Sequence, residues 1–329
     1  MRSTEPNVSL LDIVVPTTLT RTDLLRKSVN SILRQTDLSN VSIHLFINGT
    51  NEEEVDNIRS YFPSLKIRYS DTKLTIAESW LRASSCGHGK YFMLMHDDDL
   101  LSEKFVDSFK RFVEANEECV LIHTGAKIID SRDSELRTTN LTYPRVMTGD
   151  DFFRHHLEGE ISFICPSVIY NRTLVPNHLE WNKNLPFTLD VEYFLRCTRY
   201  GKIGFINQSI FKYRIHQGST SSKFKKNYKL KLKDRKHHRI FLKKEIKDRL
   251  GEYYLYLADR YYYSALSVDL WFFRLTNSRV EILSSLNIIR CLITFEWKVL
   301  KTSFFWKFLF RMFLPQILIN AVRTKRTRI

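Results

Sequence analysis

The chain has 329 residues and a net charge of +15; 43% of its residues are apolar and 26% are charged. This composition is typical of a globular protein with one large or two modest domains, and it excludes a chain that is disordered throughout. Five cysteines lie far apart without a C-x-x-C pair, which argues against a disulfide framework or a structural zinc site and favours free thiols in a reducing compartment.

Strand and helix patterns alternate through the first half of the chain. Short apolar runs predict five strands, at 11–15, 41–47, 65–69, 91–95 and 119–123. Apolar residues at helical spacing predict helices at 25–33, 76–83 and 105–113, and we expect Ser102 to cap the last of these. This order predicts an α/β fold in which a mostly parallel sheet carries helices on both faces and ligands bind beyond the carboxyl ends of the strands.

The middle of the chain, residues 124–222, is less regular. Thr148 predicts the start of a helix over 150–157, residues 162–170 are strand-like, and another helix follows Pro186. No internal repeat is visible in this region or elsewhere in the sequence.

The sequence becomes basic and helical from Lys223 onward, and this change marks the expected domain boundary. We expect residues 1–222 to form one domain and residues 223–329 a helical, basic extension. Residues 223–249 contain 13 lysines and arginines against 3 acidic residues, and residues 293–329 contain 8 against 1. Such local basic charge predicts an anionic partner, either a membrane surface or a nucleic acid.

The extension mixes basic residues with aromatic ones, as in FEWKVLKTSFFWKFLFRMFL at 295–314. No window of 18 residues there is free of charge, so we expect a helix lying in the membrane interface rather than one that spans it. A helical subdomain with solvated charges is the alternative. The N-terminal MRSTEPNVSL lacks the apolar segment of a secretory signal, so we expect a cytoplasmic protein that is peripheral on the inner face of the membrane.

Four polar residues, His96 and the aspartates 97–99, follow the apolar strand at 91–95 directly. Adjacent carboxylates that are partly buried repel one another, and a divalent cation removes that cost. Mg²⁺ and Mn²⁺ usually take one or two carboxylates together with phosphate oxygens of a substrate. The stretch therefore indicates a metal–nucleotide site, with a solvated acidic turn as the alternative.

The same stretch, GKYFMLMHDDDLL, resembles the G-x-Y-φ-φ-φ-φ-D-x-D-D segment of family 2 glycosyltransferases, which have the GT-A fold. Lined up from Gly89, His96 takes the place of the first acidic residue. The resemblance implies that Asp97 faces the nucleotide ribose and that Asp98 binds the metal. We group Asp99 with Asp98 as a candidate ligand of Mn²⁺ or Mg²⁺.

Further segments in the family's order extend the resemblance over about residues 10–222. Residues 14–36 resemble its opening strand, loop and helix, in which a Pro-Thr loop touches the nucleobase. This implies nucleotide contacts for three consecutive residues, Pro16, Thr17 and Thr18. Residues 46–55 resemble the end of its second strand, where Asn48 replaces an Asp that accepts from the base; an Asn offers a carbonyl oxygen without charge.

Residues 189–206, LDVEYFLRCTRYGKIGFI, resemble the segment that carries the family's catalytic base, which implies that role for Asp190. Sugar hydroxyls are very weak acids, so a positioned carboxylate must take the proton as the nucleophile attacks. Glu192 is the local rival, and a helix-capping role for Asp190 is the alternative.

Residues 213–221, YRIHQGSTS, resemble the family's closing H-x-x-x-x-S motif, and His216 is a candidate metal ligand through its neutral imidazole. A structural histidine is the alternative. Lys73 precedes a predicted helix and is a candidate for a phosphate contact, with a solvated lysine as the alternative. Three aromatic residues are candidates for a stacking floor under an acceptor sugar, with core packing as the alternative: Trp181, Phe163 and Tyr193.

These features predict an inverting, metal-dependent glycosyltransferase that uses a nucleotide-diphosphate sugar, most simply a UDP-sugar. The acceptor that we expect is a glycan or a lipid-linked glycan, as in bacterial surface-polysaccharide assembly. Residues 1–100 would bind the donor and residues 101–222 the acceptor. Two rival hypotheses remain: a non-catalytic scaffold on the same fold, and a basic nucleic-acid-binding protein, although no nucleic-acid-binding motif is present.

Overall fold

The computed structural model describes residues 8–139, 142–161, 164–176, 179–216, 218–219, 228–262 and 265. Backbone contacts divide the chain into two units, residues 1–216 and residues 217–329. The boundary expected after residue 222 lies outside the described residues.

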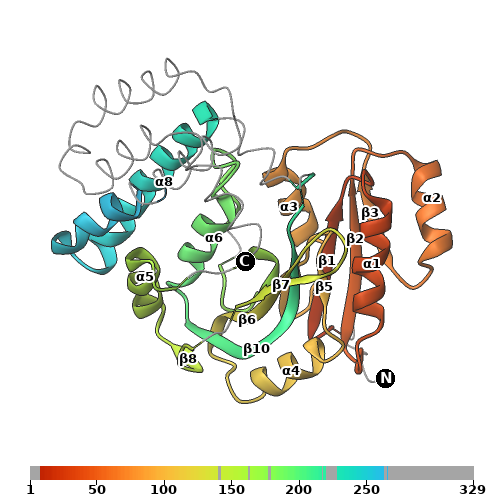
Figure 1. Ribbon diagram of the computed structural model, residues 1–329, viewed down its shortest axis with the longest axis horizontal. Helices are drawn as coiled ribbons and strands as arrows, with labels where there is room; N and C mark the ends of the chain where they lie inside the picture. Colours follow the sequence, from red (N-terminus) through yellow and green to blue (C-terminus); the bar gives the residue numbers. More distant parts are fainter. Residues whose placement is uncertain are drawn as a thin grey trace, which may run out of the picture. The chain divides into compact units, whose positions relative to one another are not determined.

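A mostly parallel sheet forms the centre of the first unit (Figure 1). Its strands run in the order β3 (Lys66–Ser70), β2 (Val41–Asn48), β1 (Leu11–Thr17), β4 (Tyr91–Leu94), β9 (Val168–Asn171), β6 (Cys119–Ile129), β10 (Lys202–Arg214) and β5 (Leu100–Leu101). The strands from β1 to β4 are parallel, and so are β6 and β10, whereas β9 is antiparallel to both of its neighbours. Two short strands pair antiparallel to β6 and β10, namely β7 (Glu135–Thr138) and β8 (Val146–Met147).

Helices cover the sheet on both faces, as the alternating pattern predicted. Residues 11, 13 and 15 of β1 share one apolar core with α1 (Thr22–Leu33), α2 (Glu52–Tyr61) and α4 (Phe105–Val113). The intervening residues point the other way. On that side Phe92 of β4 packs against Tyr170, which contacts Phe194 of α6 (Leu189–Cys197), and α3 (Ile76–Ser84) lies along β1 and β2. The predicted α/β fold is confirmed.

Side-chain caps begin two of the predicted helices, and of these the Thr148 cap was predicted from the sequence. Thr75 and Glu78 form a capping box at the start of α3. Thr148 accepts from the backbone N–H of Asp151 at the start of α5 (Gly149–Glu158), which ends at Gly159 in the left-handed conformation, φ +81°.

The predicted Ser102 cap is wrong. Helix α4 begins at Phe105, whose N–H reaches the carbonyl of Ser102, while the Ser102 N–H donates to the carbonyl of Ile210. Pairing with β10 therefore takes Ser102 out of the cap position. The strand predicted over 162–170 is also shorter than expected, because residues 165–167 around Pro166 form a 3₁₀ turn, η1, before β9.

Asp12 forms a buried ion pair at the amino end of β1. Its carboxylate accepts from Ser9 Oγ at 2.6 Å, from the Gly89 N–H at 2.7 Å and from Arg172 Nη1 at 2.7 Å. Burial alone would raise the pKa of Asp12. The nearby His44 imidazole at 3.7 Å, hydrogen bonds from Ser9 and Gly89, and the charge of Arg172 outweigh burial and lower the pKa from 3.8 to about 2.

We expect Asp12→Asn to lower the free energy of unfolding by about 2–4 kcal/mol at neutral pH, because it leaves Arg172 without its buried counter-ion. The folded pKa lies below the ordinary one, so the stabilisation is present above pH 3.8 and is lost as the pH falls toward 2. Urea unfolding at pH 7 and at pH 3 checks this, with the exposed Asp71→Asn as the control. Equal stability of the two variants at pH 7 would contradict the expectation.

The second unit contains α8 (Tyr228–Arg249), the 3₁₀ turn η2 (Glu252–Tyr254) and helical residues 255–262. Asp259 pairs with Arg239 at 2.7 Å and with Lys243 at 3.0 Å. No helix in the described part of the chain is long and apolar enough to cross a bilayer. The aromatic segment at 295–314 lies outside the described residues.

Four of the five cysteines fall in the described residues, and all four are free and buried: Cys86, Cys119, Cys165 and Cys197. The prediction of free thiols is confirmed for these four.

Candidate active site

The acidic cluster lies on the turn between β4 and β5, at the carboxyl ends of β1 and β4. The backbone N–H of Met95 still pairs with the carbonyl of Val14 at 2.9 Å, and the chain then leaves the sheet. Asp97, Asp98 and Asp99 are only 5%, 8% and 0% exposed. These carboxylates are therefore not those of a solvated acidic turn.

Asp97 is held by the loop that follows β1. Thr17 Oγ1 donates to Asp97 Oδ2 at 2.7 Å, and Arg21 Nη2 donates to Asp97 Oδ1 at 2.6 Å. Between them, Leu19 has a φ of +56°, which is unusual for a residue with a side chain and marks a strained turn. Burial raises the pKa of Asp97, and the charge of Arg21 and the bond from Thr17 oppose that rise.

Asp98 Oδ2 accepts a hydrogen bond from Arg21 Nη1 at 2.8 Å and lies 2.9 Å from His216 Nε2. Burial acts to raise the pKa of Asp98, but the charge of His96, the His216 hydrogen bond and the charge of Arg21 outweigh it and lower the pKa. His216 lies two residues beyond the end of β10, so β10 brings the predicted ligand to the cluster. Two neighbouring ligands of an octahedral Mg²⁺ with bonds of about 2.1 Å are about 3 Å apart, which matches the separation seen here.

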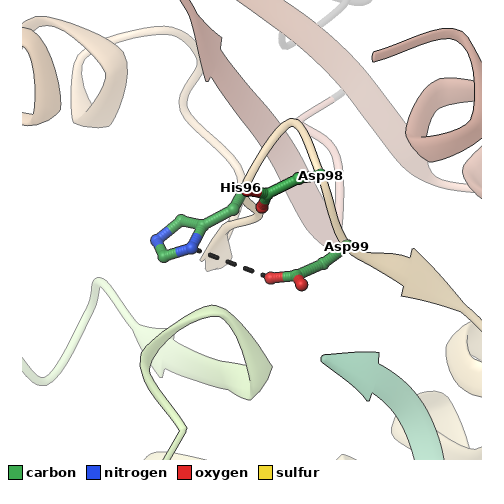
Figure 2. A group of neighbouring side chains, drawn as sticks. All are labelled: His96, Asp98 and Asp99. Carbon is green, nitrogen blue, oxygen red and sulfur yellow. Dashed lines mark ion pairs between the residues drawn. The ribbon is translucent and has the colours of Figure 1, made fainter. Parts of the chain in front are cut away.

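Asp99 joins the turn to β10. Its Oδ1 accepts from the Arg214 N–H at 2.7 Å, and Arg214 Nε donates to the carbonyl of Asp98 at 2.6 Å. Asp99 Oδ2 lies 3.7 Å from His96 Nδ1 (Figure 2) and receives no hydrogen bond from the described residues. Complete burial, together with the charge of Asp98, raises the pKa of Asp99 well above its ordinary value.

The donor atoms of this turn fit a divalent cation. One ligand atom each of His96, Asp98 and Asp99 lies within 4.8 Å of the other two (Figure 2), and His216 reaches Asp98 from β10. Asp99 Oδ2 is a buried carboxylate oxygen that receives no hydrogen bond within the described part of the chain, and the Arg21 guanidinium places a positive charge beside Asp98 and His216. Two carboxylates with imidazole nitrogens suit Mn²⁺ better than Mg²⁺, which prefers oxygen ligands alone.

Asp190 lies in the first turn of α6 and is partly exposed. Burial raises the pKa of Asp190, and the hydrogen bond that its Oδ1 accepts from the Val191 N–H at 2.8 Å and the charge of His96 oppose that rise. Glu192, the rival base, instead forms an ion pair with Arg196 at 3.0 Å.

Two side chains link Asp190 to the acidic cluster. Burial raises the pKa of Cys165, and the charge of Asp190, a hydrogen bond to Asp190 and the charge of Asp99 add to the rise. Burial likewise raises the pKa of Tyr213, and the charges of Asp99, Asp98, Cys165 and Asp190 raise it further. Asp190 and Asp99 therefore both affect the pKa of Cys165 and the pKa of Tyr213.

The other nucleotide-side candidates lie along the same edge. Both ends of the Asn48 amide are engaged by the backbone of Leu74: Oδ1 accepts from its N–H at 2.8 Å and Nδ2 donates to its carbonyl at 3.1 Å. Asn48 therefore fixes the loop before α3, in which Lys73 is exposed. Pro16 is half-buried within β1, and Thr18 is exposed in the loop that follows β1.

Two of the three predicted stacking aromatics pack inside the protein. Trp181 and Tyr193 stack on each other with ring centroids 3.9 Å apart, and both are buried. Phe163 lies outside the described residues. Trp80 of α3 contacts Trp181 edge-on at 5.1 Å, and its ring lies 5.8 Å from that of His96, so Trp80 is a partly exposed aromatic beside the acidic turn.

Comparison with known proteins agrees with this geometry. Residues 12–174 match the model of glycosyl transferase family 2. The chain belongs to this family.

Relatives of this family 2 glycosyltransferase are distant. An uncharacterized glycosyltransferase of Haemophilus influenzae is 23% identical over 208 residues, which cover 60% of this chain and 62% of the relative, so the match spans less than two thirds of that protein. One of Methanocaldococcus jannaschii is 23% identical over 218 residues, covering 64% of this chain and 72% of the relative.

Solved structures of S. aureus TarS 1–349 share the fold. The structure in complex with UDP-GlcNAc has a TM-score of 0.62 at 14% identity and covers 87% of this chain and 80% of its own. The structure in complex with UDP has a TM-score of 0.59 at 13% identity, covering 86% and 78%. The GT-A fold of this family 2 glycosyltransferase is thereby established.

Two arginines of this family 2 glycosyltransferase were missed by sequence reasoning. Arg21 stands in the loop PTTLTR, where an arginine before a helix is typical of a solvated residue. Arg214 stands in a strand and is 2% exposed. Their partners lie 76 to 195 residues away in the sequence, so no local pattern could identify these contacts.

Proposed function

We propose that this glycosyltransferase transfers a sugar from a UDP-sugar to a hydroxyl group of an acceptor, with inversion at the anomeric carbon. The pairing of Asp98 and His216 beside Arg21, at the carboxyl ends of β1 and β4, carries the proposal. Buried carboxylates, an imidazole and a guanidinium are the groups that bind a metal and a diphosphate. The TarS structure that holds UDP-GlcNAc supports a uridine nucleotide as the donor.

On the donor side, Asp97 accepts from Thr17 and Arg21 and has lone pairs left for a ribose hydroxyl. Asn48 holds the Leu74 loop in place, and the exposed Lys73 beside it provides positive charge for a phosphate. Asp98, Asp99 and His216 would hold Mn²⁺ or Mg²⁺. When bound, this cation supplies positive charge that stabilises the departing diphosphate.

On the acceptor side, Asp190 takes the proton. As the acceptor oxygen bonds to the anomeric carbon, the hydroxyl proton passes to the Asp190 carboxylate and the bond between sugar and diphosphate breaks. A single displacement of this kind inverts the configuration. Burial raises the pKa of Asp190, which makes it a stronger base than an exposed aspartate once it is ionised. Trp80 offers an aromatic face to a sugar ring in this region.

The acceptor that we propose is a lipid-linked glycan in the assembly of a polysaccharide at the cytoplasmic face of a membrane. Its support is the basic surface of α8, on which Lys233, Lys244 and Lys247 are exposed together with Ile240, 68% exposed. Lysines around an apolar residue suit an anionic lipid surface, and the protein would associate with it peripherally.

A thermal-shift panel of nucleotides tests the donor proposal. A ligand at 100 times its Kd stabilises a protein by about 2.7 kcal/mol, so UDP with Mn²⁺ should raise the melting temperature by about 5–10 °C. UDP in EDTA should give a much smaller shift, and GDP and dTDP with Mn²⁺ are the controls. The proposal fails if no nucleotide raises the melting temperature with or without Mn²⁺.

A further inference from the structure

Arg21 contacts two carboxylates of the acidic turn, Asp97 and Asp98, and the imidazole of His216. Its Nη2 donates to Asp97 Oδ1 at 2.6 Å, and its Nη1 lies 2.8 Å from Asp98 Oδ2 and 2.9 Å from His216 Nε2. The Arg21 side chain is 27% exposed, so these bonds form in a partly desolvated site. Charge-assisted bonds of this geometry are stronger than bonds between neutral groups.

The position of Arg21 on its own helix makes this arrangement informative. Arg21 is the N-cap of α1, and no side chain caps that helix end. A positive charge is unfavourable at a helix N-terminus, where the helix dipole is itself positive. The position of the guanidinium is therefore explained by its contacts with the acidic turn, because a positive charge at this end of the helix does not stabilise the helix.

The guanidinium uses the same atoms that a metal would use. His216 Nε2 lies 2.9 Å from both Arg21 Nη1 and Asp98 Oδ2, so according to its tautomer it accepts from Arg21 or donates to Asp98, and in neither case is its lone pair free for a cation. Asp98 Oδ2, 2.8 Å from the same nitrogen of Arg21, is the predicted carboxylate ligand. Cation binding must therefore break both contacts of Nη1, while the Nη2 bond to Asp97 can persist.

We propose that Arg21 is a built-in counter-cation, which occupies the metal position before the donor binds and exchanges with the metal as the diphosphate arrives. This inference rests on the proposed function. Displaced from Asp98 and His216, the planar guanidinium becomes a donor to the diphosphate oxygens. When the metal binds alone, it displaces Arg21 and the guanidinium gains no new hydrogen-bond acceptor. When the diphosphate binds with the metal, its oxygens accept from the displaced guanidinium. The two ligands therefore bind cooperatively, and Arg21 couples them.

Mn²⁺ binding to the full chain, followed by the electron paramagnetic resonance signal of free Mn²⁺, tests this coupling without measuring activity. We compare the wild type with Arg21→Gln, with and without UDP. Without UDP, Arg21→Gln should bind Mn²⁺ about tenfold tighter, because the guanidinium no longer competes with the cation at Asp98 and His216. The increase in Mn²⁺ affinity that UDP causes should shrink by about the same factor. Arg26→Gln is the matched control on α1, because Arg26 lies over the Tyr61 ring at 4.2 Å. This substitution should leave the Mn²⁺ affinity unchanged both with and without UDP.

Arg21→Lys keeps the charge but loses the paired geometry, and it serves if Arg21→Gln does not fold. It should bind Mn²⁺ more tightly than the wild type and less tightly than Arg21→Gln. Unchanged or weaker Mn²⁺ binding in the variant that folds, with UDP binding retained, overturns the exchange and leaves the proposed function standing. Failure of the wild type to bind either Mn²⁺ or UDP overturns both.

Discussion

Asp190→Asn is expected to slow sugar transfer by about 10²–10⁴-fold, the range that general-base catalysis contributes. Asn has the shape of Asp but cannot take a proton, so the acceptor hydroxyl stays protonated as it attacks. Within the described residues, no hydrogen bond or ion pair joins Asp190 to the groups proposed to hold the donor. The side-chain carbonyl oxygen of the Asn at position 190 can still accept from the Val191 N–H. Donor affinity should therefore change little.

Single-turnover transfer and UDP titration on the same preparations separate the two effects. Asp107→Asn is the matched control, because Asp107 also lies in the first turn of a helix, α4, and pairs with Arg111 at 2.6 Å away from the site. Normal transfer by Asp190→Asn would show that the base is another residue. Transfer should also fall on the acid side at a pH above 3.8, because burial raises the pKa of Asp190 and protonation removes the base.

The sequence predicted the strands on the donor side well, because each is a short apolar run with a clear end. Residues 11–15 and 41–47 fall inside β1 and β2. The long strand β10 was not predicted as one element. Polar residues at 207 and 208 interrupt its apolar pattern, and register shifts against β6 accommodate them. Only pairing with a partner strand can reveal such an irregular strand.

The residues of the candidate site also fall into those that the sequence predicted and those that only the fold reveals. The aspartates 97–99 and Asp190 stand in local patterns that can be compared with a family. The contacts of Arg21 and Arg214 depend on how distant segments pack, as does the placement of Trp80 beside His96. The tight engagement of Asn48 with Leu74 also follows from the fold alone, since the two lie 26 residues apart.

Asp98→Asn is expected to reduce metal-dependent transfer by about 10²-fold or more. The loss of a charged ligand weakens the binding of the cation, and the leaving group then loses the positive charge that stabilises it. The substitution preserves shape, and the Arg214 bond to the backbone carbonyl of residue 98 does not depend on the side chain. The turn should therefore keep its conformation. Asp107→Asn again provides the control, and circular dichroism shows whether the fold is retained.

The position of Mn²⁺ decides between this account and a purely structural acidic turn. Crystals of the wild type and of Asp98→Asn, grown with UDP and Mn²⁺, give anomalous difference maps at the manganese edge. In the wild type we predict a peak at bonding distance, about 2.1–2.2 Å, from Asp98 Oδ2 and His216 Nε2 and next to the diphosphate, and in Asp98→Asn a weak peak or none. A wild-type map with UDP bound and manganese absent from this turn would contradict the account.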